Sequence, residues 1–410
     1  MNRPDVEHVL VIGAGRQIAT RMRQLTKSRS TTLVRLTSLA RVRNAHENER
    51  VVALDPAKKS EWIDLARTIH RSDPFTRIAA FTEYEQDVAA DIAAEFGLTF
   101  HTTSTVKAVS DKFIMRERLR EAGVEDVPHL RVTSGDQIRQ LFQRHGQLVV
   151  KPASGTGSRG VTWVREEGDS SSAYDWASSG EAQSAVVAEG YLDGPGVNVE
   201  TLSEDGEHQI VAITEKFRDN AHFVEVGHRC PAQLDDSTAS AIREHVALVL
   251  TALGVRNGPS CTEVCITDEG IRTVETHLRP GGDSIPELIR DATGIDLFDY
   301  VARQAAGDKV LPEIRRLLAI PTDRVSAIWF APATAAGIIK DIKGLDDARA
   351  IDEVQDVTAF RSIGDAVGGP ELIEHSAKVV ACRAVHTSHE EALAIAQDAV
   401  SRITFVIGAP

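Results

Sequence analysis

Two glutamates in residues 261–283 (CTEVCITDEGIRTVETHLRPGGD) are spaced so that they face each other across a β-hairpin. The sequence predicts two short strands joined by a three-residue turn, DEG at 268–270, whose final glycine suits a positive φ. Centring this turn places Glu263 opposite Glu275, and two facing carboxylates repel each other. A divalent cation between them reverses that effect, because Mg²⁺ prefers acidic ligands together with phosphate oxygens. The hairpin is therefore a candidate metal site; the alternative is a surface hairpin with two exposed glutamates.

The candidate site continues along the second strand of the hairpin. Because side chains alternate along a strand, His277 and Arg279 share the face of Glu275. Gly281 and Gly282 follow, and a backbone without Cβ atoms can approach a ligand closely.

A glycine-rich loop follows a lysine in residues 147–164, QLVVKPASGTGSRGVTWV. Lys151 ends an apolar strand, and residues 152–160 are mostly Gly, Ser, Thr and Ala before a second strand begins. A loop with backbone N–H and hydroxyl donors, beside a fixed lysine, is suited to covering phosphates. It is not a Walker loop, because the lysine precedes the glycines and no GKS or GKT occurs. A plain flexible hairpin loop is the alternative.

Other segments carry further candidate ligand-binding residues. The apolar strand 185–188 runs into a turn at which Glu189 can accept a hydrogen bond from an adenine amine, although this segment alone indicates only a turn. Lys112 opens a helix that follows Asp111. The loop 82–85 follows the fourth strand, where open α/β sheets bind ligands. That loop is equally well interpreted as a polar helix start.

The strands after the glycine-rich segment add polar residues. Alternation places Asn198 and Glu200 on one face of a strand. His228 is either a donor to a substrate carboxylate or a satisfied structural histidine. His222 and His228 also suggest a metal, but a Mg²⁺ site would use oxygen ligands.

Composition limits the classes of function. The 410 residues are 42% hydrophobic and 26% charged, which is ordinary for a soluble globular protein of two or three domains. No apolar run approaches the ~18 residues of a membrane span, and no signal-peptide pattern precedes the first strand, so we expect a cytoplasmic protein without membrane contact. A net charge of −14 argues against nucleic acid as a partner. The four cysteines form no CxxC pair and are interpreted as buried free thiols.

The chain begins with an α/β pattern. Strands at 8–12, 32–36, 50–54 and 77–81, with helices near 60–71 and 85–96, predict a parallel sheet covered on both sides. The GAG sequence after the first strand is weak evidence for NAD, because Ile18 replaces the third glycine and no acidic residue closes the second strand. A Ser/Thr-rich connection at 101–110 is expected to join two domains.

The chain ends in a second, smaller α/β pattern. From residue 325 we expect strands near 326–330, 379–385 and 403–407 and a helix at 389–402. This part contains few candidate catalytic groups, which favours a structural or lid-supporting role.

Together, the Asp-Lys helix start, VVKPASGTGSRG, AEGYLDG, the glutamate pair and HLRPGGD resemble the ATP-grasp carboxylate–amine ligases, and most of all the bacterial L-amino-acid ligases that form dipeptides. The resemblance implies an α/β (α+β ATP-grasp) fold: a Rossmann-like domain at 1–104 with a parallel sheet, a central ATP-lid domain at 105–195, a mixed-sheet metal and substrate domain at 196–320, and a small α/β extension at 321–410. It implies a ligase that joins an amino acid to an amine through an acyl phosphate, releasing ADP and phosphate. It allows Mn²⁺ in place of Mg²⁺, and a homodimer.

The resemblance also assigns roles to residues. The metal ligands would be Glu263 and Glu275, and Arg279 would stabilise the charge that develops on the transferred phosphoryl group. The remaining catalytic residues would be Lys151, His277, Gly281 and Gly282. Residues that bind ATP would be Lys112, Lys151, Ser154, Gly155, Thr156, Gly157, Ser158, Glu189, Tyr191, Leu192 and Asp193. Substrate contacts would be Glu83, Glu200, Lys216, His228 and Asp283.

Two positions depart from the family pattern. His277 stands where the family usually has asparagine, so a third metal contact there is open. Gly196 stands where relatives often have a ribose-binding glutamate, so either Asp193 takes that task or the ribose is held otherwise. The alternatives are an ATP-grasp ligase for a non-peptide carboxylate, a non-catalytic nucleotide-binding regulatory protein, and an NAD-dependent oxidoreductase.

Overall fold

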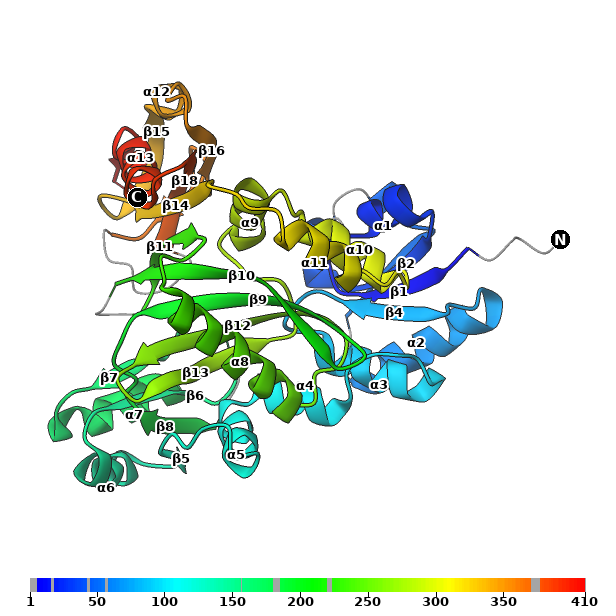
Figure 1. Ribbon diagram of the computed structural model, residues 1–410, viewed down its shortest axis with the longest axis horizontal. Helices are drawn as coiled ribbons and strands as arrows, with labels where there is room; N and C mark the ends of the chain where they lie inside the picture. Colours follow the sequence, from blue (N-terminus) through cyan, green and yellow to red (C-terminus); the bar gives the residue numbers. More distant parts are fainter. Residues whose placement is uncertain are drawn as a thin grey trace.

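Four β-sheets organise the computed structural model, which describes residues 6–15, 18–42, 45–55, 58–155, 157–179, 185–219, 223–369 and 377–409 (Figure 1). The N-terminal sheet lies at one end of the molecule. A long antiparallel sheet forms the centre, with the sheet of the glycine-rich region beside it and a small C-terminal sheet at its far end. The α/β fold class predicted from the sequence is confirmed.

The N-terminal sheet contains four parallel strands, as predicted, and their order is β3-β2-β1-β4. Its strands are β1 (His8–Ile12), β2 (Arg29–Arg35), β3 (Arg50–Leu54) and β4 (Arg77–Ala80). Its helices are α1 (Ile18–Thr26), the 3-10 helices η1 (Leu36–Arg41) and η2 (Ala45–Glu47), α2 (Lys59–Ser72) and α3 (Gln86–Phe96).

The expected Ser/Thr-rich connection is instead largely a helix. Residues Thr103–Ser110 form α4, and the Thr102 side chain caps it by accepting a hydrogen bond from Thr105 N. Serine and threonine favour helix starts as well as loops, and Val106 and Val109 give this segment a buried face. Asp111 then caps α5 (Lys112–Glu121) in the same way.

His101, immediately before this helix pair, makes folding sensitive to acid. It is 8% exposed, and burial lowers its pKa to about 4. The unfolded chain binds a proton near pH 6.5 that the folded chain does not, so stability is lost as pH falls from 6.5 towards 4. We expect the free energy of unfolding to fall by about 2 kcal/mol between pH 7 and pH 5 from this residue alone. Urea unfolding of His101→Gln should show that much less pH dependence, whereas a His145→Gln control, at an exposed histidine, should match the unsubstituted protein.

The sheet of the glycine-rich region has four antiparallel strands in the order β5-β8-β6-β7. They are β5 (His129–Val132), β6 (Leu148–Pro152), β7 (Thr162–Val164) and β8 (Val186–Gly190). The helices of this region are α6 (Gly135–His145), η3 (Glu167–Asp169) and α7 (Ser170–Ser178), of which α6 and α7 pack on each other.

The central sheet has the order β13-β12-β9-β10-β11-β14-β18-β16, and all its pairings are antiparallel, not mixed as expected. Three of these pairings, β9 with β10, β10 with β11 and β12 with β13, join strands that follow each other in the sequence, and such neighbours pair antiparallel. Its strands are β9 (Gly196–Glu204), β10 (Glu207–Arg218), β11 (Glu225–Cys230), β12 (Gly258–Thr267), β13 (Gly270–His277), β14 (Val325–Pro332), β16 (Val354–Ala359) and β18 (Lys378–His386). Its helices are α8 (Asp236–Ala252), α9 (Ile285–Thr293), α10 (Leu297–Ala305) and α11 (Leu311–Leu318).

The C-terminal part therefore shares the central sheet through β14, β16 and β18. It adds a three-stranded sheet in the order β17-β15-β19. The remaining elements are β15 (Gly337–Lys343), α12 (Leu345–Arg349), β17 (Ala366–Val367), α13 (His389–Ser401) and β19 (Thr404–Gly408). No described helix has the length and apolar character needed to cross a membrane.

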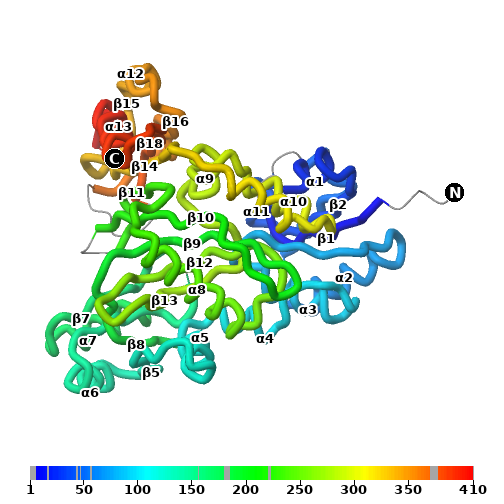
Figure 2. The backbone as a smooth tube through the Cα atoms, in the orientation of Figure 1, coloured from blue at the N-terminus to red at the C-terminus, as the bar shows by residue number. Residues whose placement is uncertain are grey.

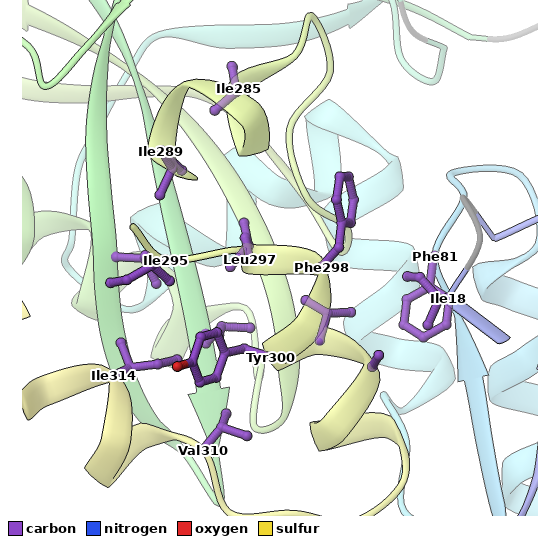
Figure 3. Close-up of a cluster of buried hydrophobic side chains, with 14 of the residues drawn as sticks. Ile18, Phe81, Ile285, Ile289, Ile295, Leu297, Phe298, Tyr300, Val310 and Ile314 are labelled. Atoms are coloured by element: carbon purple, nitrogen blue, oxygen red, sulfur yellow. The ribbon is translucent and has the colours of Figure 1, made fainter. Parts of the chain in front are cut away.

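One hydrophobic core joins the N-terminal sheet to the central sheet. Ile18 and Phe81 pack into a cluster with Phe298 and other residues of α9, α10 and α11 (Figure 3). Helix α1 packs against α10, although the two are far apart in the sequence (Figure 2). In addition, Gln86 Nε2 donates to Leu278 O over 3.0 Å. These contacts fix the loop after β4 beside the end of β13.

Candidate active site

The hairpin formed by β12 and β13 brings the two predicted glutamates together. Glu263 pairs with Glu275, as the sequence predicts. The turn differs: Thr267 pairs with Gly270, which leaves two residues in the turn instead of three. A register shift between Glu263 and Val264 restores the predicted pairing, because a β-bulge adds one residue to the partner strand.

Each of these two carboxylates has a lysine beside it. Lys216, from β10, donates to Glu263, and Lys112 Nζ lies 2.8 Å from Glu275 Oε2. Burial alone would raise the pKa of Glu275, but Lys112 and His277 hold it well below its usual range. Burial likewise opposes the charge of Lys112, and Glu275 nevertheless raises the pKa of that ammonium. Glu275 is therefore ionised at neutral pH.

Glu83, from the loop after β4, reaches the far end of the hairpin. Its Oε2 lies 3.1 Å from His277 Nδ1 and accepts from Arg279 Nε over 2.9 Å. His277 Nε2 lies 3.3 Å from Glu275 Oε1. Burial would lower the pKa of His277, but Glu275 and Glu83 together raise it to about 9. One carboxylate thus orients both the imidazole and the guanidinium.

A buried ion-pair chain lies beneath the glycine-rich loop. Lys151 donates to one oxygen of Glu189, and Arg116 Nε donates to the other over 3.0 Å. Arg116 Nη1 also donates to Glu125 over 2.6 Å. Burial would raise the pKa of Glu189, but Arg116 and Lys151 lower it to about 2. Burial also lowers the pKa of Lys151. Both Glu189 oxygens therefore bind protein cations in this structure, and its adenine contact stays a prediction.

The predicted hinge after Glu189 contains an aromatic pair that the sequence did not reveal. Tyr191 stacks on Trp163 of β7, with ring centroids 4.2 Å apart and an interplanar angle of 12°. Leu192 O accepts from Cys265 Sγ over 3.7 Å, and Asp193 is exposed. The hinge therefore contacts both the sheet of the glycine-rich region and β12.

The glycine-rich loop contacts the site at two described points. Gly155 O accepts from Lys112 Nζ over 3.1 Å, and Ser158 Oγ donates to Phe223 O over 2.9 Å. Gly155 and Gly157 have φ values of 130° and 77°, which suit glycine. Ser154 and the two glycines lie in the loop between β6 and β7. Thr156 lies outside the described residues, as does His222.

The segment after Arg279 carries a second charged cluster. Lys378 Nζ donates to Asp283 Oδ2 over 2.6 Å and lies 4.1 Å from the centroid of the Phe330 ring. His228 Nε2 lies 3.3 Å from the same Asp283 oxygen. The Lys378 side chain is 2% exposed and belongs to β18, so the C-terminal part, in which we expect few catalytic groups, supplies one buried cation beside the site.

The backbone donor of Gly281 is already engaged. Gly281 N–H donates to Glu200 Oε1 over 3.0 Å. The two carboxylate oxygens of Glu200 could not be placed from the sequence, because β9 reaches this loop only through tertiary packing.

The Lys378–Asp283 pair should couple the C-terminal part to the site energetically. We expect a double-mutant cycle with Lys378→Met and Asp283→Asn to give a coupling free energy of about 1–3 kcal/mol, because breaking a buried pair leaves an uncompensated charge. Urea unfolding of the two single variants and the double variant measures it. Strict additivity would show that the contact contributes nothing to stability.

A cavity of about 680 Å³ adjoins this cluster. Its walls include Thr82 and Glu85 from the loop after β4, Asp283 before α9, Glu287 of α9 and Phe298 of α10. The cavity lies between the N-terminal sheet and α9, next to the residues that contact Arg279. It has room for a small substrate.

Comparisons with known families agree with this geometry. Residues 145–287 match the ATP-grasp domain, and residues 329–408 match the L-amino acid ligase C-terminal domain 2. The chain therefore contains an ATP-grasp domain and an L-amino acid ligase C-terminal domain 2. The first match covers the glycine-rich loop, the hinge and the glutamate hairpin, and the second covers Lys378.

Several solved structures and curated proteins are similar to this chain in fold or in sequence. The crystal structure of L-amino acid ligase from Bacillus licheniformis has a TM-score of 0.85 and 22% identity, covering 99% of this chain and 100% of that one. Alanine–anticapsin ligase of Bacillus amyloliquefaciens is 26% identical over 252 residues, 55% of this chain and 53% of that protein. An uncharacterised protein of Sinorhizobium fredii is 26% identical over 322 residues, 77% of this chain and 65% of that protein. The chain thus spans about half to two thirds of the length of these curated relatives.

Two charged residues of this site, Arg116 and Lys378, were not predicted from the sequence. Arg116 gave no signal because α5 contains many charged residues, and only its place on the buried face of the helix distinguishes it. Lys378 lies in a segment without any motif. The four cysteines are buried free thiols, as predicted.

Proposed function

We propose that this ATP-grasp protein is an ATP-dependent ligase that joins an amino acid, or a related carboxylate, to an amine that is usually a second amino acid. The observation that supports this most strongly is the pair of facing carboxylates, Glu263 of β12 and Glu275 of β13, with Arg279 just beyond the end of β13. Phosphoryl transfer needs positioned phosphates, a metal clamp and exclusion of water instead of a protein nucleophile. The similarity to L-amino acid ligase and to alanine–anticapsin ligase supports the same substrate class.

The two glutamates fit a divalent metal, for which we propose Mg²⁺, with Mn²⁺ as the alternative. Their ligand atoms lie close together, and both groups are hard oxygen donors. A metal ion held there would neutralise charge on the phosphates of ATP. Lys112 and Lys216, which now bind these carboxylates, are placed to bind phosphate or substrate oxygens instead.

Nucleotide binding is assigned to the sheet of the glycine-rich region and to the hinge that follows Glu189. Lys151 and Lys112 bind phosphates under the glycine-rich loop, in which Ser154, Gly155, Thr156, Gly157 and Ser158 supply donors. The adenine lies at the hinge between the sheet of the glycine-rich region and β9. The residues proposed for it are Glu189, Tyr191, Leu192 and Asp193.

In the proposed reaction, a substrate carboxylate attacks the γ-phosphate of ATP, and ADP leaves. The amine then attacks the acyl phosphate, a carbon–nitrogen bond forms, and phosphate leaves. Arg279 stabilises the negative charge of both steps from a fixed position. Gly282 lies next to the acyl group, and so does Gly281 once its N–H has left Glu200. The substrates occupy the cavity beside Glu83, His228 and Asp283.

Three further features belong to this proposal. The enzyme is cytoplasmic, with homodimers allowed and neither nucleic acid nor membrane as a partner. The four domains are 1–104, 105–195, 196–320 and 321–410. The first cut falls inside α4, and a cut before Thr102 would keep that helix whole.

The test is the release of ADP and phosphate from Mg-ATP, screened over pairs of amino acids, with mass spectrometry of the products. Release that depends on both members of a pair, with one new amide bond, is the expected result. An amide formed only with a non-peptide carboxylate would move the substrate to that class. Tight Mg-ATP binding without turnover over the whole screen would favour a regulatory protein.

A further inference from the structure

His277 completes a cluster of three potential metal ligands. One ligand atom from each of Glu263, Glu275 and His277 lies within 4.8 Å of the others. The 3.3 Å between His277 Nε2 and Glu275 Oε1 is close to the separation of about 3 Å expected for neighbouring ligands on one octahedral ion. The imidazole is 6% exposed, so it is held in this place.

The other ring nitrogen of His277 has the partner that a metal-bound histidine requires. Nδ1 lies 3.1 Å from Glu83 Oε2. Metal-binding histidines almost always donate their second N–H to a carboxylate, a carbonyl or water, which fixes the ring and the tautomer. Glu83 is itself fixed by Arg279. The geometry therefore presents Nε2, and not Nδ1, towards the two glutamates.

Glu275 and Glu83 raise the pKa of His277 to about 9, so a bound ion would have to displace its proton, and the surrounding charges allow this. The three carboxylates nearby each have a partner of their own: Arg279 for Glu83, Lys216 for Glu263 and Lys112 for Glu275. A neutral imidazole between these pairs leaves all of them neutralised.

We propose that His277 is a third, nitrogen ligand of the divalent-metal site, with Glu83 as its positioning carboxylate. This inference rests on the proposed function, which supplies the metal. Binding of the ion displaces the Nε2 proton to solvent, as histidine coordination requires. Because Mg²⁺ prefers oxygen ligands whereas imidazole suits transition metals, the site favours Mn²⁺ over Mg²⁺ more than an all-oxygen site would.

Pulsed EPR of Mn²⁺ tests the ligand set directly. The sample is the full chain with ¹⁵N-labelled histidine, in excess over Mn²⁺, with ADP. We expect ³¹P coupling from the nucleotide and ¹⁵N coupling from one imidazole in the same bound ion. His277→Asn should lose the ¹⁵N coupling and keep the ³¹P coupling, whereas His208→Asn, at a histidine of β10 that contacts Ser203 and Thr251, should keep both.

A competition titration of Mn²⁺ against Mg²⁺ gives a second readout. We expect His277→Asn to shift the preference towards Mg²⁺ by about tenfold. Glu83→Gln should weaken Mn²⁺ binding about 10–100-fold while the ¹⁵N coupling persists.

The outcomes separate this inference from the proposed function. Protein-bound Mn²⁺ with ³¹P coupling but no ¹⁵N coupling overturns the role of His277 and leaves the nucleotide–metal site intact. An unchanged metal preference in His277→Asn also overturns it. Absence of protein-bound Mn²⁺ contradicts the metal site of the proposed function itself.

Discussion

Replacement of Arg279 by methionine is expected to lower kcat by about 10²–10³-fold, with a small change in the KM for ATP, because a fixed charge aimed at the transition state is lost. Arg279 is held for this task by Glu83 and by its own Pro280 carbonyl, to which Nη1 donates over 3.0 Å. Steady-state kinetics with the identified substrate pair measures the effect.

Two controls show whether the loss is specific. Arg279→Lys keeps the charge but not the planar fork, so we expect it to recover only part of the activity. Arg272→Met removes a guanidinium from the same hairpin, where it pairs loosely with Glu269 at 3.5 Å, and kcat should stay within about twofold. A raised KM with unchanged kcat in Arg279→Met would show that Arg279 binds the ground state instead.

Replacement of Arg116 by methionine should reduce the free energy of unfolding by about 3–5 kcal/mol. Arg116 is 1% exposed and binds Glu189 and Glu125, so its loss leaves two buried carboxylates without this partner. Urea unfolding followed by circular dichroism measures the change.

The matched comparison lies on the same helix. Arg120 is exposed and pairs with Glu117 over one turn, so Arg120→Met should cost about 0.5 kcal/mol or less. Combining Arg116→Met with Glu125→Gln should recover part of the loss, because one buried charge is removed with its partner. A loss below about 1 kcal/mol in Arg116→Met would show that the carboxylates are protonated or solvated without it.

The glutamate hairpin could be predicted from the sequence because its geometry is local. Strand alternation and a glycine turn fix which residues face each other, and Glu263 pairs with Glu275 as expected. Even there the turn length was wrong, since the β-bulge directly beside Glu263 leaves no mark in the sequence. The helix capped by Asp111 is local in the same sense.

Contacts that depend on tertiary packing could not be predicted in this way. The partners of Glu189 and Asp283 come from α5 and β18, and nothing in either segment marks Arg116 or Lys378 as buried. The helix α4 was taken for a linker because serine and threonine serve both as caps and in loops. Glu83 is a candidate from the sequence because the end of a parallel strand is a recurrent ligand position, but its contacts with His277 and Arg279 depend on the packing of α1 on α10.

The acyl-phosphate route is tested most directly by the fate of the substrate carboxylate oxygen. The acid member of the active pair is labelled with ¹⁸O in its carboxylate, and the phosphate and nucleotide released are analysed by mass spectrometry. The proposed mechanism predicts one ¹⁸O atom in each phosphate released, together with unlabelled ADP. Label in AMP, or unlabelled phosphate alongside amide formation, would contradict it.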